Sequence, residues 1–578
     1  MVGDKTLTHS VDEIPLETVF GGDSIYSIPY FQRYYIWGNK QLKELISDIR
    51  QILDEVQNSL FLGAIILYSR TMPVGRSNLY EVVDGQQRIT TIYLFLIALA
   101  DMYCSLNKWD EAASLVSKFL LLGPKSKEIS NIKFYPCKQD RAQINYLFKY
   151  LLGKDNLNTE LGNPSMRYLQ EIGSPRGKIT TQYKEIKKFL EQEKTEGGFE
   201  RLGSIYTALL RNFTIVQILL KDPTSCPLIF ERLNYRGMKV TTGDLVRNEI
   251  FSRTIEKPLS EVEAIYSTEW EPFYNKFGGA DSFEKYFFPY GLIEKSTVTK
   301  SNVFSVLRTK WQKESSPQVI IKELAKYQGA FLDITKNQNN CDLKKEVKEK
   351  LVNLYRANIP SSTYPFLIKL IYESSNNAID PKESELILIL LDSFLTRRAI
   401  CGHDPTGLHA VFKNLWQNCE GAPTFDKVKY RIKSYKTVPW PSDDEFRSAI
   451  GIRKLYGSGI VSYFICEYDR SWGKDCPSDK PEIEHVLPQT LTPDWKKVFS
   501  NKEHDAYKDT LANLIPVSAP LNKFVRQKPY AEKRQIYTDD SMFATPRELA
   551  RKYKVWNVET LEDRSEIISD WAVTRWPY

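Results

Sequence analysis

The stretch "LYEVVDGQQRITTIYLFLIALA" (residues 79–100) decides how the N-terminal part of the chain folds. Its first part is a short apolar run that predicts a strand. Its last part is a longer apolar run that predicts a helix. Between the two stand Asp84, Gly85, Gln86, Gln87 and Arg88. An acid, a glycine, two amides and an arginine at a strand-to-helix joint indicate a ligand-binding site.

The joint has the residue types that a phosphate requires. A helix start leaves about four backbone N–H groups free. Asp84 can cap this helix, and Gln87 can reach back to complete a capping box. Gly85 permits a tight turn and close approach of a ligand. Arg88 lies one turn in, where its guanidinium can grip an oxyanion. The joint therefore suits a nucleotide phosphate, and the alternative left open is a well-capped helix with a solvated arginine.

The rest of the chain divides by its hydrophobic pattern. Residues 20–90 alternate strand-like runs with turns, and 40–56 repeats its apolar residues at helical spacing. From about 100 to 440 the chain is mostly helical, and 383–400 is apolar on nearly all faces, which predicts a buried helix. The stretch 437–445 is rich in proline and acids and breaks the helical pattern.

These patterns predict an α+β multidomain protein. With 578 residues, the chain is long enough for two to four domains. We expect an α+β N-terminal domain over 1–255, a helical middle region over 256–440 and a compact mixed domain over 441–578.

Composition narrows the class of protein. The net charge of +7 is small for this length, so any contact with nucleic acid must come from local basic patches. No apolar run approaches the ~18 residues of a membrane span, and the polar N-terminus is no signal peptide. The eight cysteines include no CxxC pair, which indicates reduced thiols and argues against structural zinc. We expect a cytoplasmic protein with no membrane contact.

Two further polar clusters stand in the N-terminal half. The segment "YSIPYFQRYYIW" (26–37) sets Gln32 and Arg33 among aromatic residues, which suggests one wall of a pocket. The segment "IFERLNYRGMKVTTGDLVRNEIF" (229–251) places several polar residues around a turn between two helices. These residues are Glu231, Asn234, Arg236, Gly237 and Asp244. The alternative for this second segment is a polar connection between helices.

A histidine near the C-terminus carries the second candidate site. The stretch "PEIEHVLPQT" (481–490) puts Glu484 and His485 after a short strand. A nuclease that uses one divalent metal needs a base to activate water and oxygen ligands for Mg²⁺ or Mn²⁺. His485 suits the base role, Glu484 and Asn522 suit the metal, and Asn513 can fix the loop or the orientation of the histidine. The alternative is a structural histidine with its hydrogen bonds satisfied.

Basic residues follow this histidine. The side chains of 523–534 can contact a phosphate of DNA. The alternative is that this run is only a solvated face. The basic residues of the run are Lys523, Arg526, Lys528, Lys533 and Arg534, against the single acid Glu532. His504 either approaches a substrate phosphate or lies on the surface. We assign no chemistry to His9, His403 and His409.

The motifs occur together in an order that resembles a known family. The patterns "IPxFQRxYxW", "FxGxI", "VVDGQQRxTT" and "IFERLNxRGxxxTxxDLVRN" look like the N-terminal domain of the GmrSD family and its SspE-like relatives, which are modification-dependent restriction enzymes of phage defence. The resemblance implies a fold related to ParB and sulfiredoxin. It also implies that 84–88, with Gln32 and Arg33, binds and often hydrolyses a nucleoside triphosphate, whether GTP, ATP, UTP or CTP.

The C-terminal motifs resemble the HNH, or ββα-metal, nucleases. The pattern is acid–His–x–x–Pro, then Asn-Leu, then an asparagine about nine residues later. By this resemblance His485 is the general base, Glu484 and Asn522 bind Mg²⁺ or Mn²⁺, and Asn513 supports the site. Two departures are Ala512, where the family usually has glycine, and Glu484, where many HNH sites have aspartate.

The sequence therefore predicts a nucleotide-regulated, metal-dependent DNA endonuclease of phage restriction. Its expected partners are modified or phage DNA and a nucleoside triphosphate, and a homo-oligomer stays open. One alternative is an HNH nuclease that acts on RNA or structured DNA. The other is a ParB-like DNA-binding regulator that does not cut.

Overall fold

The computed structural model divides the chain into two compact units. One unit holds 1–278 and 307–322, and the other holds 279–306 and 323–578. The structure describes residues 8–30, 32–70, 78–122, 132–161, 175–221, 241–254, 257–473, 476–478 and 480–578. The expected boundary near 440 falls inside the second unit, so the division into three regions stays a prediction.

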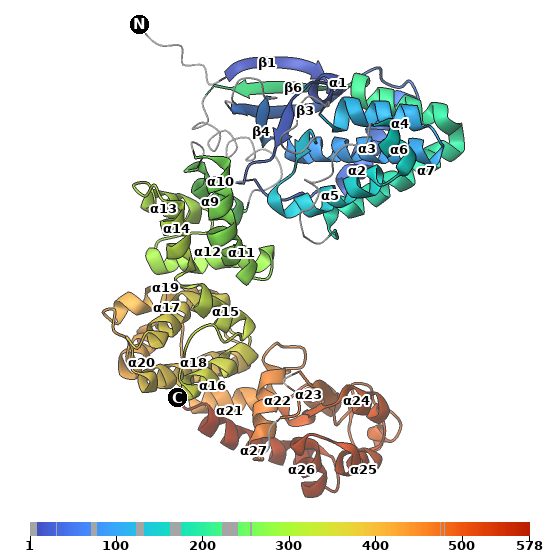
Figure 1. Cartoon of the computed structure of the whole chain (residues 1–578). Coiled ribbons are helices and arrows are strands. Elements are labelled where there is room, and N and C mark those ends of the chain that lie inside the picture. The colour runs from blue at the N-terminus through green and yellow to red at the C-terminus, as the bar shows by residue number, and fades with distance from the viewer. Residues whose placement is uncertain are drawn as a thin grey trace. The chain divides into compact units, whose positions relative to one another are not determined.

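The first unit is built on a six-stranded mixed sheet (Figure 1). The strands stand in the order β1-β6-β3-β4-β2-β5. Their bounds are β1 Thr8–Pro15, β2 Ile25–Ser27, β3 Leu60–Arg70, β4 Leu79–Asp84, β5 Phe134–Tyr135 and β6 Phe213–Leu220. The β6 strand pairs antiparallel with β1 and parallel with β3, and β3 pairs antiparallel with β4. This mixed sheet with its helices confirms the α+β expectation, whereas the relation to ParB stays a prediction.

Helix α3 (Gln86–Ser105) forms the centre of the first unit's core. It follows β4 directly and is buried along nearly its whole length, which confirms the strand and the helix predicted from 79–100. It packs mainly on α7 (Lys178–Thr207) and α4 (Trp109–Leu115), beside the sheet in Figure 1. By length and composition alone α3 could span a membrane, contrary to expectation. Because 89% of that window is buried, we assign α3 to the core.

The first unit contains further helices. Helix α2 (Asn39–Leu53) confirms the helix predicted over 40–56. The others are α1 Leu16–Gly21, η1 Val116–Leu120, α5 Lys138–Leu152, α6 Asp155–Glu160, η3 Ala208–Asn212, α9 Thr242–Ser252, α10 Leu259–Ile265, η5 Tyr266–Trp270 and α11 Glu271–Lys276. The chain passes between the units after residue 278, within α13 (Val303–Lys310) and within α14 (Pro317–Ala325).

One strand was not predicted, and one strand prediction needs correction. The strand β6 lies inside the stretch expected to be mostly helical, and it is an interior strand of the sheet. Its pairing partners β1 and β3 are more than 140 residues away in sequence, so no local sequence pattern predicts this pairing. The strand-like segment around 24–37 gives only the three-residue β2. Proline cannot continue a sheet ladder in the interior, and Pro29 follows β2 closely.

The second unit is mostly helical. Its α18 (Pro381–Cys401) is the buried helix predicted over 383–400. The fully buried Arg397 of α18 donates to the Trp576 carbonyl at 2.6 Å and to Asp443 at 2.5 Å, which joins α18 to the C-terminal end of the chain. The other helices up to the hairpin are α12 Ala280–Glu294, α15 Gln328–Lys336, α16 Lys345–Arg356, η6 Ser361–Thr363, α17 Tyr364–Ser375, η7 Pro405–Gly407, α19 Leu408–Asn418, α20 Phe425–Ser434, α21 Asp443–Ile452 and α22 Val461–Arg470.

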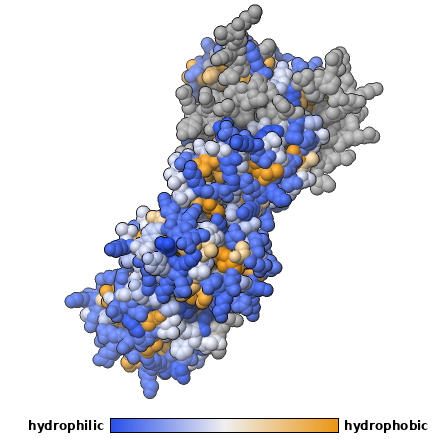
Figure 2. Space-filling model, turned by 90° about the vertical axis from the view of Figure 1, so that its left-hand side faces the viewer, coloured by the Kyte–Doolittle hydropathy of each residue, from blue (hydrophilic) through white to orange (hydrophobic). Residues whose placement is uncertain are grey.

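A small antiparallel hairpin and short helices complete the second unit. The hairpin pairs β7 (Glu482–His485) with β8 (Leu514–Val517). The helices are η8 Trp495–Lys497, α23 Asn501–Tyr507, η9 Leu511–Asn513, α24 Ala519–Val525, α25 Tyr530–Asp540, α26 Ala544–Lys552 and α27 Val558–Arg575. On the face drawn in Figure 2, the apolar side chains of the described residues stand in small groups among hydrophilic ones. All seven described cysteines are free thiols.

The turn between β4 and α3 gives a prediction about stability. Gly85 has a φ of +91°, and a Cβ added there would lie 2.7 Å from Ile65 Cγ2 and 3.1 Å from the Ala64 carbonyl oxygen. We expect Gly85→Ala to lower the free energy of unfolding by about 1–3 kcal/mol, through backbone strain and the clash. Urea unfolding of the full chain measures this. Gly22→Ala is the control, because Gly22 has open space and a φ of −79°. Equal effects of the two substitutions would contradict the account.

Candidate functional site

The strand-to-helix joint differs from the capping box that the sequence predicts. The residue before α3 is Gly85, in the left-handed conformation, and no side chain caps this helix end. Asp84 belongs to the end of β4. The capping-box prediction is therefore wrong, because the joint turns through the glycine and not through a capping acid. The start of α3 keeps its backbone N–H groups without a side-chain cap.

The two glutamines hold the preceding loop over this helix start. The Gln87 side-chain oxygen accepts from the Ile36 N–H at 2.9 Å and from the Trp37 N–H at 3.3 Å, and its amide nitrogen donates to the Tyr34 carbonyl at 3.3 Å. Gln86 donates to the Gln32 side chain at 3.0 Å, and Gln32 donates to the carbonyl of Val83 at 2.6 Å. Gln32, Gln86 and Gln87 are therefore buried parts of one network that fixes the 32–37 segment.

Arg88 contacts the protein itself. Its guanidinium donates to the Ala64 carbonyl at 2.5 Å and lies 3.4 Å from the Asp84 carboxylate. Burial raises the pKa of Asp84, while the charges of Arg88 and Arg33 and a hydrogen bond from Gly85 oppose that rise. Arg33 lies 3.8 Å from the carboxylate of Asp244. Two arginines thus stand near one half-buried acid beside the helix start.

The third N-terminal motif is only partly described. Glu231, Asn234, Arg236 and Gly237 lie outside the described residues. Asp244 lies in α9, where it takes part in the capping of that helix by Thr241.

The C-terminal histidine stands at the end of a hairpin strand. His485 is the last residue of β7 and pairs with Leu514 of β8. Its Nε2 lies 3.1 Å from the Asp509 carboxylate, and its ring meets the Tyr456 ring edge-on, with centroids 4.3 Å apart. Burial lowers the pKa of His485, and the hydrogen bond and charge of Asp509 oppose this shift.

Asn513 and His504 hold the loop that follows the histidine. Asn513 is fully buried and makes four hydrogen bonds, to the N–H and the carbonyl of Leu487, to the Lys508 carbonyl and to the Trp556 indole N–H. His504 Nε2 bonds to the Pro488 carbonyl at 2.8 Å. His504 is buried, so the prediction that it lies on the surface is wrong, and an approach to phosphate stays a prediction. Its ring is occupied with the backbone of this loop.

Glu484 is bound to a buried lysine. Its Oε1 accepts from Lys533 Nζ at 2.6 Å and from the Tyr537 hydroxyl at 3.0 Å, and Lys533 also donates to the His485 carbonyl at 2.8 Å. Burial raises the pKa of Glu484 and lowers that of Lys533, and the attraction between the pair opposes both shifts. The fully buried Lys533 is not placed to contact DNA, which corrects its prediction as a phosphate contact.

The other predicted residues lie on or near the surface. Lys523 and Arg526 are exposed, Asn522 is half-buried on α24, and Lys528 lies 3.3 Å from Glu532. Neighbouring residues of a strand point to opposite faces, so Glu484 faces α25 while His485 faces Asp509. The structure thus brings His485 together with Asp509 and Tyr456, and Glu484 together with Lys533.

Asp509 is a partner of His485 that the sequence does not predict. It stands four residues before Asn513 in a run of mixed charge, and only the pairing of β7 with β8 brings it to His485. The sequence signal was weak, an acid four residues before the Asn-Leu pair.

Both ends of the chain match domains of one family. The N-terminal domain of the GmrSD restriction endonuclease matches residues 16–251, and the C-terminal domain of GmrSD restriction endonucleases matches residues 440–571. The first match spans the joint at 84–88, and the second spans His485 and its neighbours. No curated protein matches the chain.

The buried pair of Glu484 and Lys533 gives a second prediction. We expect Lys533→Met to lower the free energy of unfolding by about 3–5 kcal/mol, since it leaves a buried carboxylate without its cation. Chemical denaturation of the full chain measures this. Adding Glu484→Gln should recover much of the loss, because the remaining amide carries no charge. A double variant no more stable than Lys533→Met would show that the pair is not the cause.

Proposed function

Because this chain belongs to the GmrSD family of restriction endonucleases, we propose that it is a metal-dependent DNA endonuclease controlled by a nucleoside triphosphate. The family supports a restriction nuclease role with DNA as substrate. The observation that carries the finer proposal is the pairing of His485 with Asp509 at the end of a hairpin that leads into α24. Two strands followed by a helix is the order of elements that names the ββα-metal nucleases.

His485 acts as the general base in this proposal. A carboxylate only accepts hydrogen bonds, so Nε2 of His485 carries the hydrogen that Asp509 accepts. The other ring nitrogen, Nδ1, then keeps its lone pair and can take a proton from water. The lowered pKa keeps the ring neutral near neutral pH, as a base requires. Asp509 fixes the ring, while Asn513 and His504 fix the loop behind it.

In this proposal Glu484 and Asn522 would hold a hard divalent cation, although Glu484 is bound by Lys533 on the face of β7 opposite His485. Oε1 of Glu484 accepts from Lys533 and Tyr537, and Asn522 offers a side-chain amide oxygen from α24. Among the described residues no group of three or more His, Cys, Asp or Glu could hold a metal. A site with few protein ligands suits Mg²⁺ or Mn²⁺, because these ions keep several waters and bind substrate phosphate. Such a site does not suit zinc, which takes three or four protein ligands. The cation would supply charge stabilisation at the scissile phosphate.

The joint at 84–88 is the proposed triphosphate site. An uncapped helix start with Arg88 and Arg33 beside it presents N–H groups and positive charge to phosphate oxygens. The glutamines serve the site indirectly, because their amides already hold the 32–37 segment. Arg88 would exchange its contacts with Ala64 and Asp84 for the ligand.

The biological setting follows from the family. We propose that the protein acts in the cytoplasm on modified or phage DNA, with the N-terminal part as sensor and nucleotide switch. Exposed Lys523 and Arg526, next to the hairpin in sequence, are the candidate contacts to the DNA backbone.

A cleavage assay with the full chain tests the function. Phage DNA with and without base modification, plain DNA and RNA are incubated with Mg²⁺ or Mn²⁺ and each triphosphate in turn. We expect DNA cutting that needs the metal, stops with a chelator and depends on a triphosphate. Cutting of RNA alone would identify the rival nuclease, and DNA binding without cutting under all conditions would favour a regulator.

The partner of the histidine gives a third prediction. We expect Asp509→Asn to slow DNA cleavage about ten- to a hundredfold, because the ring loses the carboxylate that sets its tautomer and orientation. Single-turnover rates measure this, and the unfolding transition checks that the fold is kept. His403→Ala is the matched control, since His403 also pairs with an acid, Glu445, but lies far from the hairpin in sequence. A rate unchanged by Asp509→Asn would remove Asp509 from the site.

The nucleotide joint gives a fourth prediction. We expect Arg88→Ala to weaken triphosphate binding at least about tenfold, the usual effect of losing a charge-assisted hydrogen bond. Isothermal titration with each triphosphate measures this. The matched control is Arg211→Ala, whose side chain is 66% exposed and pairs with Glu17 on the surface of the same unit. Equal affinities in the two variants would place the phosphates elsewhere.

A further inference from the structure

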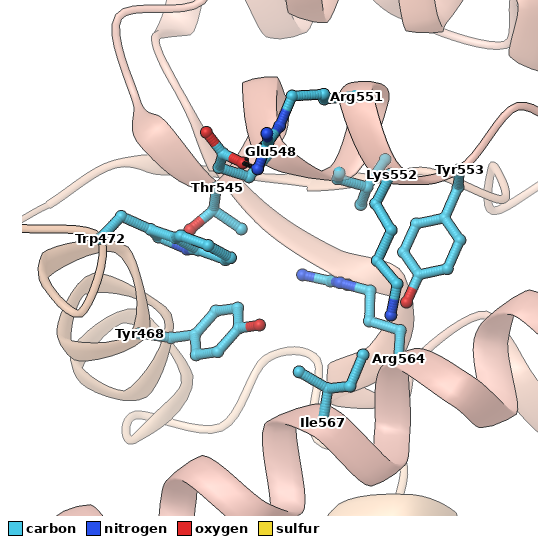
Figure 3. A pocket seen from close by; sticks show the side chains of 10 residues that line it. Tyr468, Trp472, Thr545, Glu548, Arg551, Lys552, Tyr553, Arg564 and Ile567 are labelled. Atoms are coloured by element: carbon cyan, nitrogen blue, oxygen red, sulfur yellow. Dashed lines mark hydrogen bonds and ion pairs between the residues drawn. The ribbon is translucent and has the colours of Figure 1, made fainter.

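A cavity of about 310 Å³ lies in the second unit, apart from the residues proposed above for catalysis and metal binding. Its walls come from the end of α22 and the turn after it, from α26 and from α27 (Figure 3). The volume is at the lower end of the range for small-molecule sites. None of the functions proposed above uses this cavity.

One wall of the cavity is aromatic. Tyr468 is buried and Trp472 is 42% exposed, and their ring centroids lie 6.1 Å apart in an edge-on arrangement. Figure 3 shows both rings pointing into the cavity. A tryptophan that keeps so much of its surface in contact with water offers a flat face for a planar ring.

The opposite wall holds a buried cation. Arg564 is 4% exposed, and Figure 3 shows its guanidinium reaching toward the middle of the cavity. It donates to the carbonyls of Ala512 and Leu514. No described carboxylate forms an ion pair with it, although buried charges ordinarily have a partner of opposite sign. Burial lowers the pKa of this guanidinium. The cavity therefore has a place for an anion.

The rim adds further polar groups. Arg551 has a side chain that is 77% exposed and pairs with Glu548, and Lys552 pairs with Asp563. Thr545 is buried, and its hydroxyl has no hydrogen-bond partner among the described residues. An unsatisfied buried hydroxyl is costly, so a ligand that bonds to it gains free energy.

We propose that this cavity binds a single nucleotide, with its base against Trp472 and Tyr468 and its phosphate on the basic side chains opposite. A planar aromatic ring joined to an anion matches an aromatic wall that faces a cationic one. Stacking of bases on aromatic side chains tolerates any base, so the site selects a nucleotide and not a sequence. The source is either a nucleotide of a DNA strand or a free mononucleotide.

Binding and cross-linking with the full chain test this site. The probes are thymidine 5′-monophosphate, a short single-stranded oligothymidylate and inorganic phosphate. Ultraviolet cross-linking with peptide mapping locates each thymidine probe. Trp472→Ala is the main variant, and Tyr430→Ala is its control, because Tyr430 is an aromatic residue of the same unit that is 68% exposed and does not line the cavity. Arg551→Ala is a second exposed variant, with Lys345→Ala, whose side chain is 84% exposed, as its control.

We expect Trp472→Ala to weaken binding of a thymidine probe about tenfold, the usual scale for one lost stacking contact, with cross-links in 468–472 or 545–553. Arg551→Ala should weaken it too, and neither control should change it. Binding of the monophosphate identifies a free nucleotide as sufficient, and binding of the oligonucleotide alone identifies the DNA strand. The proposal is overturned if Trp472→Ala leaves both probes unaffected, or if phosphate alone binds as tightly as either. Because no step of the test involves cleavage, its result is independent of the proposed nuclease.

Discussion

Buried side-chain amides must find hydrogen-bond partners, and this constraint fixes both candidate sites. In the first unit Gln87 holds the backbone of 34–37 over the start of α3. In the second unit Asn513 holds both backbone groups of Leu487, two residues after His485. Leaving such a buried group unsatisfied costs about 1–3 kcal/mol, so each loop has little freedom to move away. The chemistry is assigned to neighbours of these amides, and the amides determine where those neighbours stand.

The sequence predicts well what depends on local periodicity. The helices α2 and α18 and the strand-to-helix transition at 79–100 follow from the spacing of apolar residues, because burial of one face decides them. It predicts poorly what depends on pairing across the chain. To predict that β6 is an interior strand, one must know that it pairs with β1 and β3. To predict that Lys533 is buried, one must know that it pairs with Glu484, which is distant in sequence. Asp509 was missed for the same reason.

The hairpin shows why residue types alone do not separate catalytic from structural roles. Glu484 and His485 are adjacent in sequence, but Glu484 is bound by a buried lysine and His485 by a half-buried aspartate. Of the two histidines in this region, His504 has its Nε2 on a loop carbonyl and His485 has its Nε2 beside the Asp509 carboxylate.

The central claim is that His485 takes the proton from the attacking water, and cleavage by His485→Ala tests it most directly. Single-turnover cleavage of phage DNA is measured with Mg²⁺ and a triphosphate, and DNA binding is measured in parallel. We expect the rate to fall by a factor of about 10²–10⁴, the contribution of a general base, while DNA affinity and the unfolding transition stay unchanged. Cleavage at the wild-type rate by a folded His485→Ala protein would contradict the account.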